Sequence, residues 1–159
     1  KYVYIQSKFT KTGSDWINNV TLINRGLFVT YNLWENLSSG KDDRIRYEIQ
    51  KINRRFIRRL EKKCNVHQGQ RLERFIVTET DKSRNHCHMI VETPIHLQDY
   101  MMVKHIIGSL HKTKGLGKMD IRGVREKQHL IDYLCKEWSP NKDPIEWENC
   151  YFKDRNNNF

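Results

Sequence analysis

Long hydrophobic runs are absent from this sequence. No apolar stretch approaches the roughly 20 residues that a membrane-spanning helix needs, and no secretory signal opens the chain. We therefore expect no segment that lies within a membrane. The chain starts at Lys1 rather than at methionine, which favours a fragment of a longer protein.

Cysteine is scarce, and its spacing does not suit the common cysteine-based sites. The four cysteines, Cys64, Cys87, Cys135 and Cys150, include no Cys-x-x-Cys pair and form no regular disulfide framework. This pattern favours a reducing compartment. Cys64 and His67 have the spacing of half a zinc site, but no matching second half follows, so structural zinc is the weaker interpretation.

Acidic residues are outnumbered by basic ones. The chain of 159 residues carries 29 Lys and Arg against 19 Asp and Glu, a formal net charge of +10. This length suits a single domain over residues 1–159. The basic excess predicts a polyanionic partner, nucleic acid first and an acidic membrane surface second. A basic protein with no such partner is the alternative.

The most informative stretch is 85–92, whose alternating residues predict a strand. In a strand, His86 and His88 project from the same face, where two imidazoles can hold one metal ion. The run at 75–79 predicts a second strand, and a short polar link suits a hairpin that brings Glu79 beside His86. We therefore predict a metal site made of Glu79, His86 and His88. Two ordinary histidines on a polar face are the alternative.

The remaining periodic segments predict an α+β fold. The expected elements are strands at 27–32, 75–79, 85–92 and 119–124, and helices at 45–60, 97–112 and 126–138. Their order predicts a ferredoxin-like (RRM-like) β-α-β-β-α-β antiparallel sheet with an additional C-terminal helix. In that arrangement the histidine strand lies inside the sheet beside strand 27–32. We also predict a strand at 2–5 and a turn at 11–15, while the polar tail after Pro140 carries no clear signal.

The helix at 45–60 is amphipathic, and its outer face is strongly basic. Its apolar stripe consists of Ile45, Ile49, Ile52, Phe56 and Leu60, with Asp42 or Asp43 as a cap and Asn65 near the end. Among the basic residues, Arg54 and Arg58 are candidate DNA contacts, although such a face is often simply solvated. The helix at 97–112 is expected to turn Met101, Ile106, Ile107 and Leu110 inward.

Three polar residues of the last helix are spaced to share one face: His129, Tyr133 and Lys136. A tyrosine hydroxyl is a weak nucleophile, but a neighbouring lysine favours the phenolate and can steady a phosphate group. With a metal ion on the phosphate oxygens, Tyr133 and Lys136 suffice to cut a phosphodiester by transesterification. A plain helix tyrosine and a surface lysine are the alternative.

Three segments stand in a familiar order: Phe28-Val-Thr-Tyr-Asn32, His86-Cys-His88 and Tyr133-Leu-Cys-Lys136. Over residues 27–138 the chain resembles the HUH endonuclease superfamily, and specifically the single-tyrosine rolling-circle replication initiators (Rep proteins). The resemblance implies nicking and rejoining of single-stranded DNA at a replication origin, through a covalent 5′-phosphotyrosine intermediate.

The resemblance also implies roles for individual residues. His86, His88 and Glu79 would bind Mn²⁺ or Mg²⁺, Tyr133 would be the nucleophile with Lys136 beside it, and Thr30 and Asn32 would lie near the DNA. His129 is a further candidate DNA contact because it shares the helix face of Tyr133. Tyr100 is the second candidate nucleophile. No second tyrosine follows Tyr133 at helical spacing, which argues against the paired-tyrosine class.

The expected partner is single-stranded or hairpin origin DNA, together with host replication proteins, and no membrane. A helicase domain often follows such a domain in Rep proteins, and nothing within this chain suggests one. The location would be the cytoplasm for a bacterial, phage or plasmid protein and the nucleus for a eukaryotic virus. The rival interpretations are an HUH transposase or relaxase, a non-catalytic nucleic-acid-binding module and a zinc-stabilised interaction domain.

Overall fold

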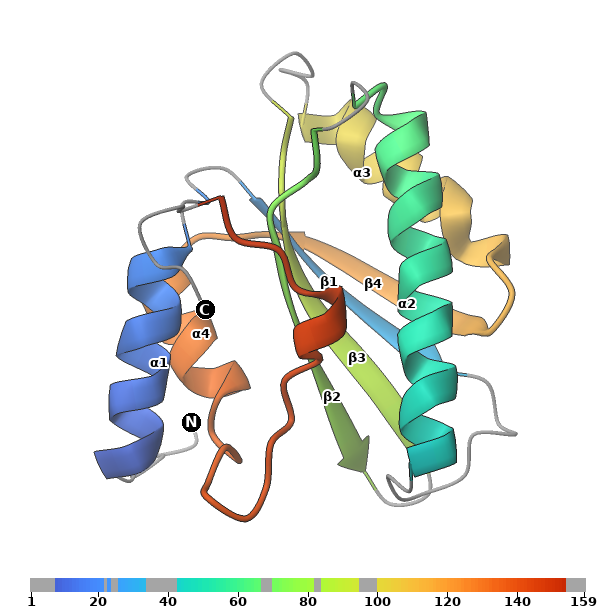
Figure 1. Ribbon diagram of the computed structural model, residues 1–159. Helices are drawn as coiled ribbons and strands as arrows, with labels where there is room; N and C mark the ends of the chain where they lie inside the picture. The colour runs from blue at the N-terminus through green and yellow to red at the C-terminus, as the bar shows by residue number, and fades with distance from the viewer. Residues whose placement is uncertain are drawn as a thin grey trace.

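The computed structural model describes residues 8–21, 23, 26–33, 43–66, 70–81, 84–94 and 100–153. Within these ranges the protein has an α+β fold, with one four-stranded antiparallel sheet of order β2-β3-β1-β4 (Figure 1). The elements are α1 (Lys8–Val20), β1 (Gly26–Leu33), α2 (Asp43–Lys63), β2 (Arg74–Asp81), β3 (Arg84–Glu92), α3 (Tyr100–Ser109), η1 (Leu110–Lys112), β4 (Leu116–Gly123), α4 (Lys127–Leu134) and η2 (Trp147–Asn149). The expected α+β class is confirmed.

Helices cover both faces of the sheet, as Figure 1 shows. Because side chains alternate along a strand, Val29 and Tyr31 of β1 join the buried cluster with α2 and α3. Phe28 points the other way and packs on a second cluster, which contains Ile17 of α1 and Ile131 of α4. The sheet therefore lies between an α2/α3 layer and an α1/α4 layer. Within the described ranges, no helix has the length and apolar character to cross a bilayer.

Helix α2 follows its sequence pattern closely. All five residues of the predicted stripe are buried: Ile45, Ile49, Ile52, Phe56 and Leu60. The helix begins at Asp43 and ends in a Schellman turn, in which Asn65 adopts a positive φ of 52°. The Asn65 and Val66 N–H groups donate to the carbonyls of Lys62 and Glu61. The predicted cap at Asp42 lies outside the described residues.

The predicted turn at 11–15 is wrong, because these residues belong to α1. Gly13 and Ser14 suggested a turn, but here the glycine serves packing. A Cβ on Gly13 would lie only 2.3 Å from the Trp138 ring, so the absent side chain lets α1 approach the segment after α4. Ser14 and Ile17 of the same helix are buried. The predicted strand at 2–5 lies outside the described residues.

Two predicted helices differ in detail. The helix predicted at 97–112 is formed by α3 followed by η1. Met101 is 63% exposed whereas Val103 is buried, so the predicted inward position of Met101 is wrong. The second ends as α4 at Leu134 rather than at Trp138. Lys136 therefore lies in the turn after the helix, where its N–H donates to the Tyr133 carbonyl at 3.2 Å.

The segment after Pro140 is not the uninformative tail that its polarity suggested. Ile145 is fully buried and bridges Val77 of β2, and Tyr151 bridges Arg74. The Glu146 N–H donates to the Ile76 carbonyl at 2.9 Å. This segment, red in Figure 1, therefore covers the outer edge of β2, which would otherwise offer unpaired backbone groups.

Candidate metal centre

The β2–β3 hairpin brings the three predicted metal ligands together. Glu79 and His86 are directly paired across the two strands, and His88 follows two residues later on the same face. The Glu79 Oε2 atom lies 3.0 Å from His86 Nε2 and 3.2 Å from His88 Nε2. The three ligand atoms all lie within 4.8 Å of one another, so this cluster can hold a metal ion. No second such group of His, Cys, Asp and Glu occurs among the residues that the structure describes.

The His88 imidazole has supporting contacts besides Glu79. Thr30 pairs with His88 across β1 and β3, and its Oγ1 lies 2.9 Å from His88 Nδ1. When Nε2 serves as a metal ligand, Nδ1 carries the ring proton and donates it to the threonine oxygen. The Phe28 ring stacks on His88 with a centroid distance of 5.4 Å and an interplanar angle of 15°. The Phe28 stack therefore limits rotation of the His88 ring, and with a metal ion on Nε2 the Thr30 contact would select the tautomer protonated on Nδ1.

Glu79 remains a carboxylate in this setting. Burial would raise its pKa, but hydrogen bonds with His86, His88 and Lys136 together lower that pKa well below the ordinary range of a glutamate. One carboxylate oxygen, Oε2, faces the imidazoles, and the other, Oε1, accepts from Lys136 Nζ at 2.5 Å. A charged carboxylate that keeps one oxygen directed at two imidazoles is suited to a divalent cation.

Lys136 connects the metal cluster to Tyr133. Its Nζ lies 3.7 Å from the centre of the Tyr133 ring while it bonds to Glu79. Burial lowers the pKa of Lys136, but the interactions with Glu79 and Tyr133 outweigh burial and raise it above the ordinary lysine value. Tyr133 is 48% exposed, on the same sheet face as Glu79. The predicted tyrosine, lysine and metal ligands therefore form one continuous group.

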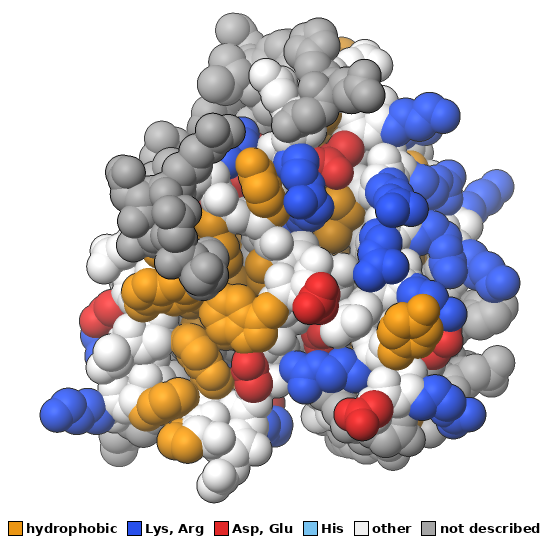
Figure 2. Space-filling model, in the orientation of Figure 1, with side chains coloured by type: hydrophobic (Ala, Val, Ile, Leu, Met, Phe, Trp, Pro, Cys, Tyr) orange, Lys and Arg blue, Asp and Glu red, His pale blue; other side chains and the backbone are white. Residues whose placement is uncertain are grey.

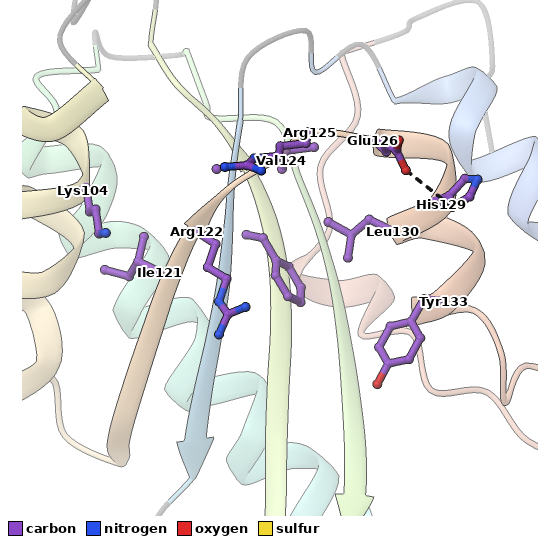
Figure 3. Close-up of a pocket in the computed structure, with 11 residues that line it drawn as sticks. Lys104, Ile121, Arg122, Val124, Arg125, Glu126, His129, Leu130 and Tyr133 are labelled. Carbon is purple, nitrogen blue, oxygen red and sulfur yellow. Dashed lines mark ion pairs between the residues drawn. The ribbon is translucent and has the colours of Figure 1, made fainter. Parts of the chain in front are cut away.

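An open hollow of about 720 Å³ lies beside this group, at the β4 edge of the sheet. Phe28 lines it as well as contacting His88, so the hollow adjoins the metal cluster. Figure 3 shows Tyr133 reaching in from α4 and Arg122 from β4, with Lys104 at the far side. His129 lines the same hollow, strongly exposed, with Nδ1 3.6 Å from Glu126 Oε2.

The other predicted site residues fall into two groups. Asn32 pairs with His86 across β1 and β3 and is half-buried on the face of the metal cluster. Arg54 and Arg58 lie on α2, which packs against the opposite face, so the structure does not bring them to the cluster. Tyr100 is the first residue of α3, a helix that packs in the same layer as α2.

Two contributors to the site were not recognised in the sequence. Phe28 was part of a matched segment, but its stacking on His88 depends on the pairing of β1 with β3. Arg122 belongs to a strand in which Asp120 and Arg122 alternate with apolar residues. That alternation was a usable signal for a polar open face.

The remaining candidate, a zinc site near Cys64, gains no support. Cys64 is buried in the apolar cluster of α2, and His67 lies outside the described residues. All four cysteines are free.

Comparisons of the chain with protein-family models, with curated proteins and with solved structures gave no match. A function therefore has to be inferred from the residues of this chain and their geometry.

Proposed function

We propose that the protein is a metal-dependent, sequence-specific single-strand DNA endonuclease and strand transferase of the HUH type, which nicks and rejoins a replication origin. The observation that carries this proposal is the position of Lys136, which contacts both Glu79 of the metal cluster and the Tyr133 ring. The Lys136 side chain thereby links the candidate nucleophile Tyr133 to the candidate metal ligand Glu79.

The ligand set supports Mn²⁺ or Mg²⁺ as the ion. Two imidazoles and one carboxylate occupy three positions and leave others for water and phosphate oxygens. When bound, the ion makes the phosphorus of a DNA phosphodiester more electrophilic and offsets the charge that builds on its oxygens.

Tyr133 would perform the covalent step. Its hydroxyl oxygen attacks phosphorus, a new O–P bond forms, and the bond from phosphorus to the 3′ oxygen breaks. The tyrosine loses one proton and the leaving 3′ oxygen gains one, which yields a 5′-phosphotyrosine and a free 3′ hydroxyl. Lys136 stays positively charged beside the ring, where it would offset negative charge on the attacked phosphate. Because the bond energy is retained in the phosphotyrosine, the reverse reaction rejoins the strand.

The arrangement of the elements supports the same family. The strand order β2-β3-β1-β4, with α2 between β1 and β2 and α3 between β3 and β4, supports a ferredoxin-like arrangement. Helix α4 follows β4 and would be the additional helix that carries the nucleophilic tyrosine.

Single-stranded or hairpin origin DNA is the substrate that the surroundings favour. A phosphodiester has to reach an ion on one sheet face, and an unpaired strand can enter the hollow between β4 and α4. Arg122 and Lys104 would contact its phosphates, while Phe28 offers a ring on which a base can stack. Host replication proteins and a helicase domain are further partners that fit this function.

The test is covalent adduct formation. The protein is incubated with labelled, origin-like hairpin and single-stranded oligonucleotides and Mn²⁺, and the products are separated on a denaturing gel. We expect a DNA-linked protein band that disappears with EDTA and in Tyr133→Phe. Tyr47→Phe is the matched control, because Tyr47 is similarly exposed but lies on α2. An adduct that persists in EDTA or in Tyr133→Phe contradicts the mechanism.

A non-catalytic single-strand-binding module is the second candidate. The exposed aromatic and basic lining of the hollow favours it, because sheet aromatics often stack on single strands. The same Tyr133→Phe variant separates the two candidates, because a binding module forms no adduct in either protein. An HUH transposase or relaxase would share the adduct and differ only in the DNA that it cleaves.

A further inference from the structure

Two pairs of arginines in the second half of helix α2 differ in their contacts. Arg55 donates to the Lys114 carbonyl at 2.6 Å, and Arg59 donates to Thr113 Oγ1 at 2.8 Å, so this pair holds the segment before β4. Arg54 and Arg58 are exposed on the neighbouring face of the helix. Within the described ranges, neither makes a hydrogen bond or ion pair to another part of the chain. Arg55 and Arg59 thus hold a neighbouring segment, whereas Arg54 and Arg58 hold none of the segments that the structure describes.

The unpaired arginines line a small cavity between α2, η2 and the start of β2. Its volume is about 160 Å³, and its charged lining consists of Arg54, Arg58, Arg71, Arg74, Glu61 and Glu148. Arg74 is almost fully buried and donates to the Asn149 and Leu72 carbonyls and to Glu61. Since Glu61 and Arg74 offset each other, three arginines face one glutamate in the rest of the lining.

We propose that this cavity binds a phosphate group of a DNA backbone that lies along α2. Planar guanidinium groups suit phosphate oxygens because they donate two hydrogen bonds in parallel. Arg54 and Arg58 stand one helical turn apart, where like charges repel, and a bound anion relieves that repulsion. The Arg71 guanidinium is already positioned, with its carbon 4.9 Å from the centre of the Tyr151 ring.

The surroundings of the cavity favour DNA over an isolated anion. Lys and Arg side chains gather over α2 in Figure 2 and continue the positive charge beyond the cavity. An extended polyanion can use this whole surface, whereas a single phosphate ion uses only the cavity. Because α2 packs on the sheet face opposite Glu79, this site is separate from the metal centre. It does not depend on the proposed nicking activity.

The test measures binding of a labelled DNA duplex by fluorescence anisotropy in EDTA, at several salt concentrations. The variants are Arg54→Ala/Arg58→Ala and Arg71→Ala. Lys62→Ala/Lys63→Ala is the matched control, because it removes the same charge from exposed positions of the same helix. Circular dichroism and thermal melting verify that each variant folds.

We expect the double arginine variant to bind roughly tenfold more weakly than the lysine control, with a salt slope lower by about 1 for each lost phosphate contact. Equal losses in the arginine and lysine variants would overturn the proposal. A titration with inorganic phosphate at constant ionic strength tests whether the cavity instead binds a free phosphate ion. The DNA assignment is wrong if the arginine variants lose binding of inorganic phosphate but bind DNA as the wild type does. The cavity would then be a site for a free phosphate ion.

Discussion

The hydroxyl oxygen of Thr30 lies 2.9 Å from Nδ1 of His88, on the side of the ring that faces away from Glu79. This contact joins the central strand β1 to the candidate metal centre. Thr30 was expected near the DNA, but its hydroxyl is directed to an imidazole, so we assign it a positioning role for the ligand His88.

Replacing Thr30 by valine should weaken metal binding while the fold persists. Valine has nearly the same shape but no hydroxyl, so His88 loses the acceptor that holds its Nδ1 proton. Loss of such a supporting hydrogen bond typically lowers metal affinity about 10- to 100-fold. Isothermal titration with Mn²⁺ measures the change. Thr30→Ser retains the hydroxyl and should retain most of the affinity; equal affinity of the valine and wild-type proteins would contradict the assignment.

Lys136→Met should slow formation of the covalent adduct by roughly a hundredfold at saturating metal. Methionine nearly keeps the length of the side chain but removes the positive charge beside Tyr133, which would otherwise offset charge on the attacked phosphate. Metal affinity should not fall, because Glu79 Oε1 is then released from its ion pair. Single-turnover kinetics gives the rate, and Lys142→Met is the control, since Lys142 is exposed and pairs with Glu137. A large loss of metal affinity with an unchanged rate would instead indicate a role in assembling the cluster.

Asn53→Ala should destabilise the protein by about 2–4 kcal/mol, because it leaves buried polar partners unsatisfied and creates a cavity. Asn53 is fully buried, accepts a hydrogen bond from the Tyr31 hydroxyl at 2.5 Å and donates to Asn149 at 3.3 Å. Urea unfolding measures the change. Lys51→Ala, on the solvent side of the same helix, should stay within about 0.5 kcal/mol; similar losses in both variants would show that this network contributes little.

The cysteine thiols should react slowly with alkylating reagents at pH 8 in the folded protein. Burial raises the pKa of Cys64 and Cys87 to about 11, and of Cys135 and Cys150 to about 12. A raised thiol pKa means that the reactive thiolate is scarce at pH 8, and its fraction grows only as the pH approaches 11. Mass spectrometry after iodoacetamide treatment, with and without denaturant, tests this. Rapid labelling of the native protein would contradict the buried placement of Cys64, Cys87 and Cys135.

Regular elements with strong periodicity were predictable because their signal lies in neighbouring residues. The stripe of α2 and the shared face of His86 and His88 follow from the geometry of a single helix or strand. The position of Glu79 beside His86 was also predictable, because a short link between two strands allows few pairing registers. Helix α1 was missed because Gly13 is explained only by the Trp138 ring packed against it.

The residue types of the metal centre, and the face on which the histidines stand, were already decided by the order of amino acids along two adjoining strands. Tertiary packing alone decided that Lys136 reaches Glu79 and Tyr133 together, that Thr30 supports His88, and that the segment after Pro140 covers β2. These contacts join residues far apart in the chain. Local periodicity carries no information about which distant surfaces meet, because that depends on how all the helices share the two faces of one sheet.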